Sequence, residues 1–278
     1  MGDDSILVLG ATGKTGRRVL ARLRMLGAPV RAASRSSEAA FDWADSTGWD
    51  AALDGIATVY IVPPDVPGPV YDFVARAEAA GVTHLVLLSG RGADQWGDTD
   101  FGAGMLSAED AVRGSQLGWT VVRSSNFSQN FDEELFHEPL VAGELALPAG
   151  AMPEPFIDLE DVADVMAEIL TEPSRHSRQT YELSGPRALT FAEATELISR
   201  ASGLFMTYRR VSADDYAVAL VNAGLSEVDA RSNAAMFVMM DRGIIADPTD
   251  DVAAVLGRAP RTFEEYVVRT AAAGGWRR

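Results

Sequence analysis

The chain of 278 residues contains no cysteine, which excludes disulfide bonds, thiol catalysis and thiolate metal ligands. It also lacks any run of about 18 consecutive apolar residues, so we expect no transmembrane helix and no membrane partner. Basic residues number 24 against 40 acidic ones, and the net charge of −16 argues against a nucleic-acid partner. Residues 1–4 are acidic and lead directly into an apolar stretch, so we expect no secretory signal and a cytoplasmic protein.

A short apolar run followed by three glycines opens the chain. Residues 6–9 have the composition of a buried parallel strand. Gly10 allows a sharp turn, Gly13 lets backbone approach a phosphate, and Gly16 lets a helix pack closely on the sheet. The N–H groups at the start of that helix would face the phosphate. The spacing predicts a dinucleotide site, the alternative being a plain strand–helix turn. The predicted phosphate-binding residues are Gly10, Thr12, Gly13, Lys14, Thr15 and Gly16.

The end of the second predicted strand indicates which dinucleotide binds. NAD-specific sites usually place Asp or Glu about 20 residues after the glycines. Ser34 and Arg35 occupy that place here. A guanidinium and a hydroxyl bind a 2′-phosphate that a carboxylate would repel, so we expect NADP(H), unless Arg35 is only a solvated loop residue. Lys14 would add a second positive charge. Asp42 would accept from the adenine amino group, although an ordinary turn explains it equally well.

Apolar strands alternate with helical stretches over the first two thirds of the chain. Strands are predicted at 6–9, 29–33, 41–43, 57–62, 84–90, 118–123 and 179–183, and helices at 15–26, 45–53, 70–80 and 162–170. The alternation predicts an α/β fold with a doubly wound parallel sheet of the Rossmann type. Ligands bind at the carboxyl ends of such strands, where Pro63 and Ser89 complete the predicted cofactor site.

The last third of the chain is mostly helical. We expect a short strand at 206–211 and helices at 191–201, 212–223, 226–242, 247–256 and 262–273, the first opening with a capping box, Thr190 to Glu193. The pattern predicts an NADP-binding domain at 1–183 and a smaller substrate domain at 184–278. Residues 131–155 would contribute to the substrate side.

The stretch 124–130 follows the sixth predicted strand and would lie over the nicotinamide. Asn126 and Gln129 carry uncharged donors and acceptors that suit a carboxamide or a substrate oxygen, the alternative for Asn126 being a helix cap. Asn126 is therefore also a predicted cofactor residue. His137 is a candidate proton donor, although a lone histidine on an amphipathic helix is more often structural.

Three further stretches carry weaker predictions. Residues 145–155 are rich in Pro, Gly and Ala and form a candidate flap. Asp158 is interpreted as a strand exit and Asp161 as a helix cap, and no histidine accompanies them at metal-ligand spacing, so no metal site is predicted. The methionines within 236–240 suit an adaptable pocket, but a packing face or a dimer interface is the more common use of such residues.

The motifs that carry a family resemblance are Gly-Ala-Thr-Gly-x-x-Gly at 10–16, Arg35, Val62-Pro63-Pro64, the stretch 80–89, Arg123-x-x-x-Phe127-x-x-Asn130, and 156–163, 181–186 and 257–263. Together they resemble the NmrA-like family of atypical short-chain dehydrogenases, over nearly the whole chain. The resemblance implies a Rossmann fold that binds NADP(H). The family includes NADPH-dependent reductases of quinones and triphenylmethane dyes, and NADP(H)-sensing regulators without turnover.

The sequence departs from the short-chain dehydrogenases at their catalytic dyad. Those enzymes use Tyr-x-x-x-Lys, in which the tyrosine passes a proton to the carbonyl oxygen. Lys14, in the glycine loop, is the single lysine of the chain, and residues 104–110 contain neither Tyr nor Lys. An enzyme of this kind must transfer hydride without that acid, as reduction of a quinone permits.

We therefore expect an NADPH-dependent reductase of a quinone-like or other conjugated, apolar or aromatic small molecule, in secondary metabolism. The alternatives are a non-catalytic NADP(H) sensor that acts through a partner protein, and a cofactor-using isomerase or cyclase. Either a monomer or a homodimer fits the sequence.

Overall fold

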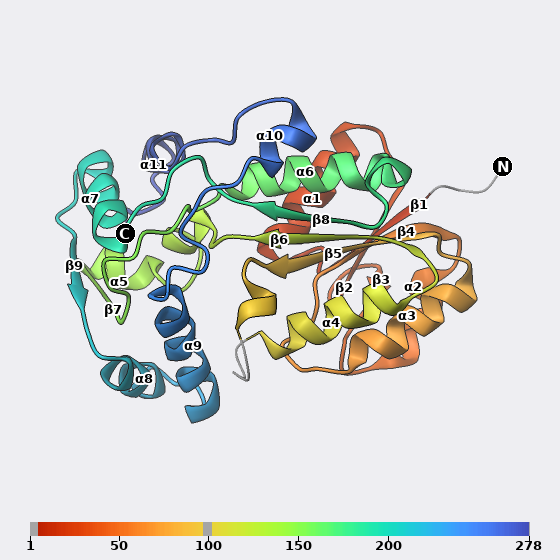
Figure 1. Ribbon diagram of the computed structural model, residues 1–278, viewed down its shortest axis with the longest axis horizontal. Helices are drawn as coiled ribbons and strands as arrows, with labels where there is room; N and C mark the ends of the chain where they lie inside the picture. Colours follow the sequence, from red (N-terminus) through yellow and green to blue (C-terminus); the bar gives the residue numbers. More distant parts are fainter. Residues whose placement is uncertain (1–4, 97–101, 278) are drawn as a thin grey trace.

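Seven parallel strands form the central sheet of the computed structural model, which describes residues 5–96 and 102–277 (Figure 1). The strand order is β3-β2-β1-β4-β5-β6-β8. The strands are β1 (Ser5–Leu9), β2 (Val30–Ser34), β3 (Ala39–Ala40), β4 (Ile56–Ile61), β5 (His84–Gly90), β6 (Gly118–Ser124) and β8 (Gln179–Leu183). The order reverses beside β1, which is the switch point where such sheets bind ligands. The predicted doubly wound α/β fold is confirmed.

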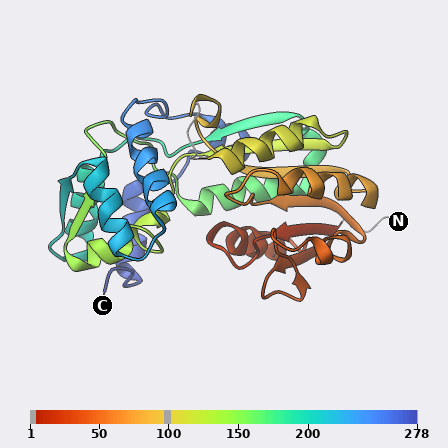
Figure 2. The same ribbon diagram turned by 90° about the horizontal axis from the view of Figure 1, so that it is seen from below.

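Helices cover both faces of this sheet (Figures 1 and 2). One face packs against α1 (Lys14–Met25), α6 (Leu159–Thr171) and α10 (Asp251–Leu256). The other packs against α2 (Trp49–Leu53), α3 (Pro69–Ala80) and α4 (Ala103–Gly114). Short 3-10 turns lie at Ser46–Gly48, Ala93–Gln95, Ser128–Phe131 and Pro173–His176. The middle of the sheet is therefore buried on both sides, which is why β1, β4 and β5 are largely apolar runs.

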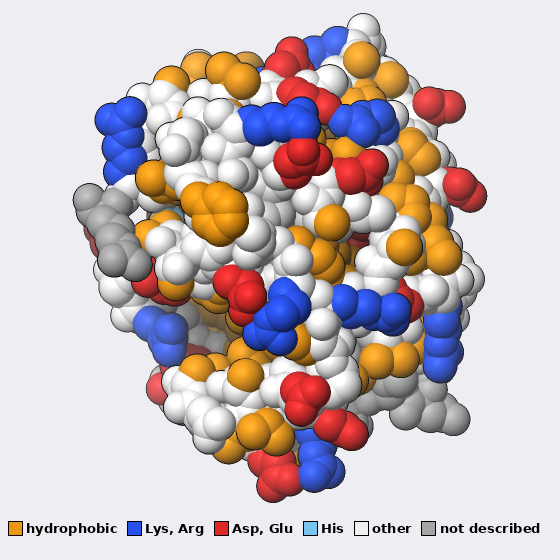
Figure 3. All heavy atoms as spheres, turned by 90° about the vertical axis from the view of Figure 1, so that its left-hand side faces the viewer, with side chains coloured by type: hydrophobic (Ala, Val, Ile, Leu, Met, Phe, Trp, Pro, Cys, Tyr) orange, Lys and Arg blue, Asp and Glu red, His pale blue; other side chains and the backbone are white. Residues whose placement is uncertain are grey.

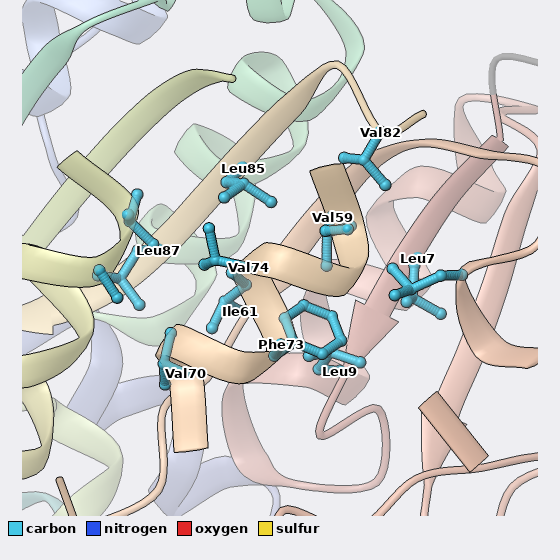
Figure 4. Packing of buried hydrophobic residues seen from close by; sticks show 14 of the residues in the cluster. Leu7, Leu9, Val59, Ile61, Val70, Phe73, Val74, Val82, Leu85 and Leu87 are labelled. Atoms are coloured by element: carbon cyan, nitrogen blue, oxygen red, sulfur yellow. The ribbon is translucent and has the colours of Figure 1, made fainter. Parts of the chain in front are cut away.

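The strand side chains alternate between two hydrophobic cores. Leu7 and Leu85 pack with Phe73 and Val74 of α3, as Figure 4 shows. Ile6, beside Leu7, points to the opposite face and packs with residues of α1 and α6. Two fully buried faces fix the strand register, because a shift of one residue would exchange the two cores.

A second group of elements lies beyond the carboxyl ends of the strands, with its own aromatic core. It contains α5 (His137–Ala142), β7 (Glu144–Leu147), α7 (Phe191–Ser202), β9 (Thr207–Arg210), α8 (Ala213–Asn222), α9 (Glu227–Met240) and α11 (Phe263–Ala272). Strands β7 and β9 pair in parallel. Phe131, Phe156 and Phe191 meet at centroid distances of 5.1–6.0 Å. Figure 3 faces this group and shows hydrophobic side chains interspersed with arginine and acidic side chains.

The division of the chain between residues 183 and 184 stays a prediction. The packing adds that α10, which lies between α9 and α11 in sequence, contacts α6 and β8 of the sheet layer. Val252 of α10 is completely buried there. The chain thus returns to the sheet layer between two helices of the outer group, α9 and α11.

Several local predictions were wrong. The third strand is Ala39–Ala40, not 41–43, because Phe41 and Trp43 turn into an aromatic cluster instead of pairing with a strand. The predicted flap at 145–155 begins as strand β7. Asp158, not Asp161, caps α6, and accepts a hydrogen bond from the Glu160 N–H at 3.0 Å.

The capping box from Thr190 to Glu193 is confirmed. No helix within the described ranges could span a membrane.

Candidate cofactor and substrate site

The glycine loop joins β1 to α1 and leaves the start of the helix open. Gly13 caps α1 without any side-chain hydrogen bond to the helix N–H groups. Gly10 has φ of +64°, a conformation that disfavours any side chain. A Cβ at Gly16 would overlap the Gly10 carbonyl oxygen, so α1 can approach the loop only with glycine there. This backbone fits the pyrophosphate of a dinucleotide, because the uncapped N–H groups and the helix dipole attract an anion.

A cavity of about 710 Å³ runs along the carboxyl ends of the strands and reaches α9. Its volume lies within the usual range for small-molecule sites. The predicted cofactor residues that line it are Gly10, Thr12, Gly13, Lys14, Thr15, Ser34, Arg35, Asp42, Pro63, Ser89 and Asn126. Gly16 lies behind this lining, against the backbone of Gly10 and Ala11. The structure brings these residues together, and their contacts with a cofactor stay a prediction.

Arg35 and Ser34 lie at one end of the cavity, at the carboxyl end of β2. Ser34 is buried, and its hydroxyl lies 2.6 Å from that of Ser37. Arg35 is exposed, and within residues 5–96 and 102–277 it makes no hydrogen bond or ion pair, so its guanidinium is available to a phosphate. Asp42 lines the cavity, and its Oδ1 accepts a hydrogen bond from the Ala44 N–H at 2.9 Å. The side chain therefore stabilises a turn, which was the alternative to a contact with the adenine amino group.

Lys14 is directed away from Arg35, toward the loop after β6. Its Nζ donates to Asn130 Oδ1 at 2.6 Å and pairs with Glu134 at 2.7 Å. It also lies 5.1 Å from the centroid of the Phe127 ring. The structure does not support the prediction that Lys14 adds its charge to that of Arg35, because Glu134 already balances it.

A buried ion pair supports the ends of β5 and β6. The Ser89 hydroxyl donates to Glu109 Oε1 at 2.7 Å, and Arg123 donates to both oxygens of Glu109 at 2.9 and 2.8 Å. Burial alone would raise the pKa of Glu109, but the hydrogen bonds from Arg123 and Ser89 outweigh it and hold that pKa below its usual value. Glu109 is therefore an ionised acceptor, and Ser89 presents its oxygen lone pairs rather than its proton to the cavity.

Sequence reasoning missed the partner of Asn126. Both the backbone N–H and Nδ2 of Asn126 donate to Glu154 Oε1, at 2.9 and 2.7 Å. Glu154 is only 2% exposed. Burial raises its pKa to about 7, although the Asn126 hydrogen bonds and the charge of Arg91 act in the opposite direction. Glu154 lies in the stretch predicted to be a flap, where no sequence signal distinguished it.

Two of the catalytic candidates lie outside the cavity lining. The Gln129 side chain is buried, donates to Asp158 Oδ1 at 2.8 Å and accepts from the Leu159 N–H at 2.9 Å. His137 lies with Nε2 3.0 Å from the carbonyl oxygen of Gly275. Gln129 thus fastens the start of α6 and His137 contacts the C-terminal region. Neither side chain reaches the site, and Asn126 is the remaining candidate.

The far end of the cavity is apolar. Its lining there includes Trp96, Met105, Met236, Met239, Met240, Ile244 and Ile245. Met105, in the first turn of α4, lies within residues 104–110, the stretch that contains neither Tyr nor Lys. Among the lining residues that the structure describes there is no tyrosine, histidine or glutamate. The sequence lacks the Tyr-Lys dyad, and the cavity is lined here by flexible apolar side chains instead.

Arg91 joins β5 to the segment after α9. Its Nη1 donates to Ser125 Oγ at 3.0 Å and to the Ile245 carbonyl at 3.3 Å, and its Nη2 donates to the Asp247 carbonyl at 3.0 Å. The guanidinium is almost completely buried. These contacts hold Ile245 in the cavity wall. Within the described ranges, no group of acidic and histidine side chains could hold a metal ion.

Comparisons with known proteins agree with this geometry. Residues 10–173 match a protein family described as NAD(P)H-binding. The chain is 31% identical to the NAD(P)H azoreductase of Xenophilus azovorans, over 97% of this chain and 99% of that protein. The NADPH-dependent quinone oxidoreductase QOR2 of Escherichia coli, solved with NADPH, superposes with a TM-score of 0.81 at 24% identity, over 95% and 99% of the two chains. The negative transcriptional regulator NmrA, solved with NAD, superposes with a TM-score of 0.76 at 18% identity, over 99% and 97%.

The matched family and the azoreductase relative identify the chain as an NAD(P)H-dependent oxidoreductase. The chain belongs to the NAD(P)H-binding family, and the Rossmann fold that the resemblance to the NmrA-like family implies is confirmed. A nicotinamide dinucleotide cofactor follows from this membership.

Proposed function

We propose that the protein is an NADPH-dependent reductase of quinone-like or other conjugated aromatic acceptors. One observation carries the proposal: a single cavity has a polar end with a free arginine and an apolar end lined by methionines. The first suits a 2′-phosphorylated dinucleotide and the second a flat apolar molecule. The azo and quinone acceptors in the names of the similar proteins have the same conjugated character.

The bound cofactor would supply the hydride, and the chain would bind and orient both reactants. Gly10, Gly13 and the start of α1 would hold the pyrophosphate, and Arg35 with Ser34 the 2′-phosphate. This order along the cavity leaves the ends of β5 and β6, with Asn126, for the nicotinamide. Met105 and the residues of α9 would exclude water from the face that the acceptor approaches.

The lining residues that the structure describes include no tyrosine, histidine or glutamate that would serve as the proton donor. We infer that the preferred acceptors are those whose reduced anion is stable enough to take its proton from water, such as quinones. Unactivated ketones need an acid in the transition state and would be poor substrates.

The test is oxidation of NADPH, followed by its absorbance, with a quinone, an azo dye and an unactivated ketone as acceptors. We expect turnover with the first two, little with the ketone, and a clear preference for NADPH over NADH. Arg35→Ala should reduce that preference by about tenfold to a hundredfold, because charged hydrogen bonds to the 2′-phosphate are lost.

The matched control is Arg200→Ala, because Arg200 is an exposed arginine on α7 outside the cavity. Its cofactor preference should equal that of the wild type. Rapid reduction of the ketone would contradict the inference about the acceptor. Tight NADPH binding without turnover on any acceptor would favour the sensor instead.

A further inference from the structure

Asn126 is held by a buried carboxyl group that the proposed function does not use. Asn126 follows β6 and lines the cavity, while Glu154 lies behind it. The two residues meet through one oxygen, Glu154 Oε1, which receives the backbone N–H of Asn126 and its Nδ2. The side-chain amide thus has its nitrogen directed into the protein.

The backbone contact determines how the side-chain amide must be oriented. A backbone N–H can only donate, so Glu154 Oε1 must be an acceptor. The Asn126 atom that contacts the same oxygen must then be the donor Nδ2. Nδ2 has a second contact in the same wall, with Met240 Sδ at 3.5 Å. Among the described residues none donates to Asn126 Oδ1, which leaves that oxygen as an acceptor for a ligand.

Glu154 is itself fixed by its neighbours. Its backbone N–H donates to the Leu189 carbonyl at 2.8 Å, and the Leu189 N–H donates back at 2.9 Å. Glu154 Oε2 is buried and has no hydrogen-bond partner among the described residues. A buried polar atom without a partner is costly, so stability alone does not explain a glutamate here. The charged group that acts on it is Arg91, which also lines the cavity.

We propose that Glu154 is a positioning residue that turns the Asn126 amide oxygen toward the cavity, where it accepts a hydrogen bond from the carboxamide NH₂ of the nicotinamide. The proposal rests on the proposed function, which places the nicotinamide beside Asn126. Glu154 would thus favour a dinucleotide whose nicotinamide carries a carboxamide. It would act by orienting Asn126, without touching the cofactor itself.

The test compares binding of NADPH with binding of its reduced 3-acetylpyridine analogue, in which a methyl group replaces the carboxamide NH₂. Both dissociation constants are measured by titration calorimetry without an acceptor. The wild type should bind NADPH about fivefold more tightly, the value of one ordinary hydrogen bond. Glu154→Met removes the acceptor at similar volume, so its ratio should fall to about one. Glu154→Gln keeps an acceptor oxygen and should keep most of the wild-type ratio.

The matched control is Glu196→Gln, because Glu196 is an exposed glutamate on α7. Its ratio should equal that of the wild type. A folded Glu154→Met protein that still prefers NADPH fivefold would overturn the proposal, as would a ratio of one in Glu154→Gln. The second outcome can be read even if Glu154→Met does not fold. Failure of the wild type to bind either dinucleotide would instead refute the proposed function.

Discussion

The pH dependence of stability gives a direct test of the state of Glu154. Burial raises its pKa from 4.5 to about 7. Between these values the folded protein keeps a proton that the unfolded chain releases, so the contribution of Glu154 to the free energy of unfolding falls as the pH rises through this window. Each unit of pKa difference corresponds to about 1.4 kcal/mol, so the carboxyl group costs about 2–3 kcal/mol between pH 5 and pH 8. Glu154→Gln does not titrate and avoids this cost.

The assay is urea unfolding of the cofactor-free protein at pH 5, 6, 7 and 8. We expect the free energy of unfolding of Glu154→Gln, relative to that of the wild type, to increase by about 2–3 kcal/mol from pH 5 to pH 8. Every other titrating group is common to both proteins and cancels in this difference. Glu196→Gln, an exposed substitution on α7, should show a much smaller change over the same series. A stability difference between Glu154→Gln and the wild type that stays constant with pH would refute the reasoning, because it would mean that Glu154 ionises normally.

Two further substitutions test other parts of the structure. Gly16→Ala should destabilise the protein by about 1–3 kcal/mol in thermal unfolding and weaken NADPH binding in calorimetry, because its Cβ would overlap the Gly10 carbonyl. Gly114→Ala is the control: its added Cβ would have no atom within 4 Å, so this substitution should not destabilise the protein. Burial and the neighbouring His176 lower the pKa of His84 to about 4, so the folded state resists a proton that the unfolded chain accepts near 6.5. The contribution of His84 to stability should therefore fall as the pH drops from about 6.5 toward 4, opposite in sign to the contribution of Glu154. His84→Gln lacks this loss, so its stability relative to the wild type should rise over that range; a difference that stays constant with pH in urea unfolding would contradict the assignment.

The sheet and the glycine loop could be predicted because their signals are local. A strand buried on both faces is a continuous apolar run, and Gly10 and Gly16 are needed for backbone reasons that neighbouring residues decide. Phe41 and Trp43 misled the prediction because aromatic residues are common in strands. Here they pack against Trp49 and Phe73, which the sequence does not place beside them.

The small group of helices and the far end of the cavity were harder to predict because their contacts join distant residues. Helix α9 carries both packing and lining side chains: Phe237 is completely buried in the aromatic core, whereas Met236 and Met240 line the cavity. Hydrophobicity alone cannot separate these roles. The same holds for Gln129 and Asn126: both are uncharged amides, and only the structure shows that Gln129 contacts the start of α6 whereas Asn126 contacts Glu154 and lines the cavity.

The position of Lys14 allows occupancy of the cavity to be followed by chemical labelling of one side chain. Apart from the amino terminus of the chain, Lys14 supplies the single primary amine among 278 residues, and it lines the cavity. Its ammonium group is paired with Glu134 and lies near the Phe127 ring, so acylation requires that pair to open. An amine-selective label would therefore modify one side chain, and the protection of that side chain by a dinucleotide would measure occupancy of the site without any assay of turnover.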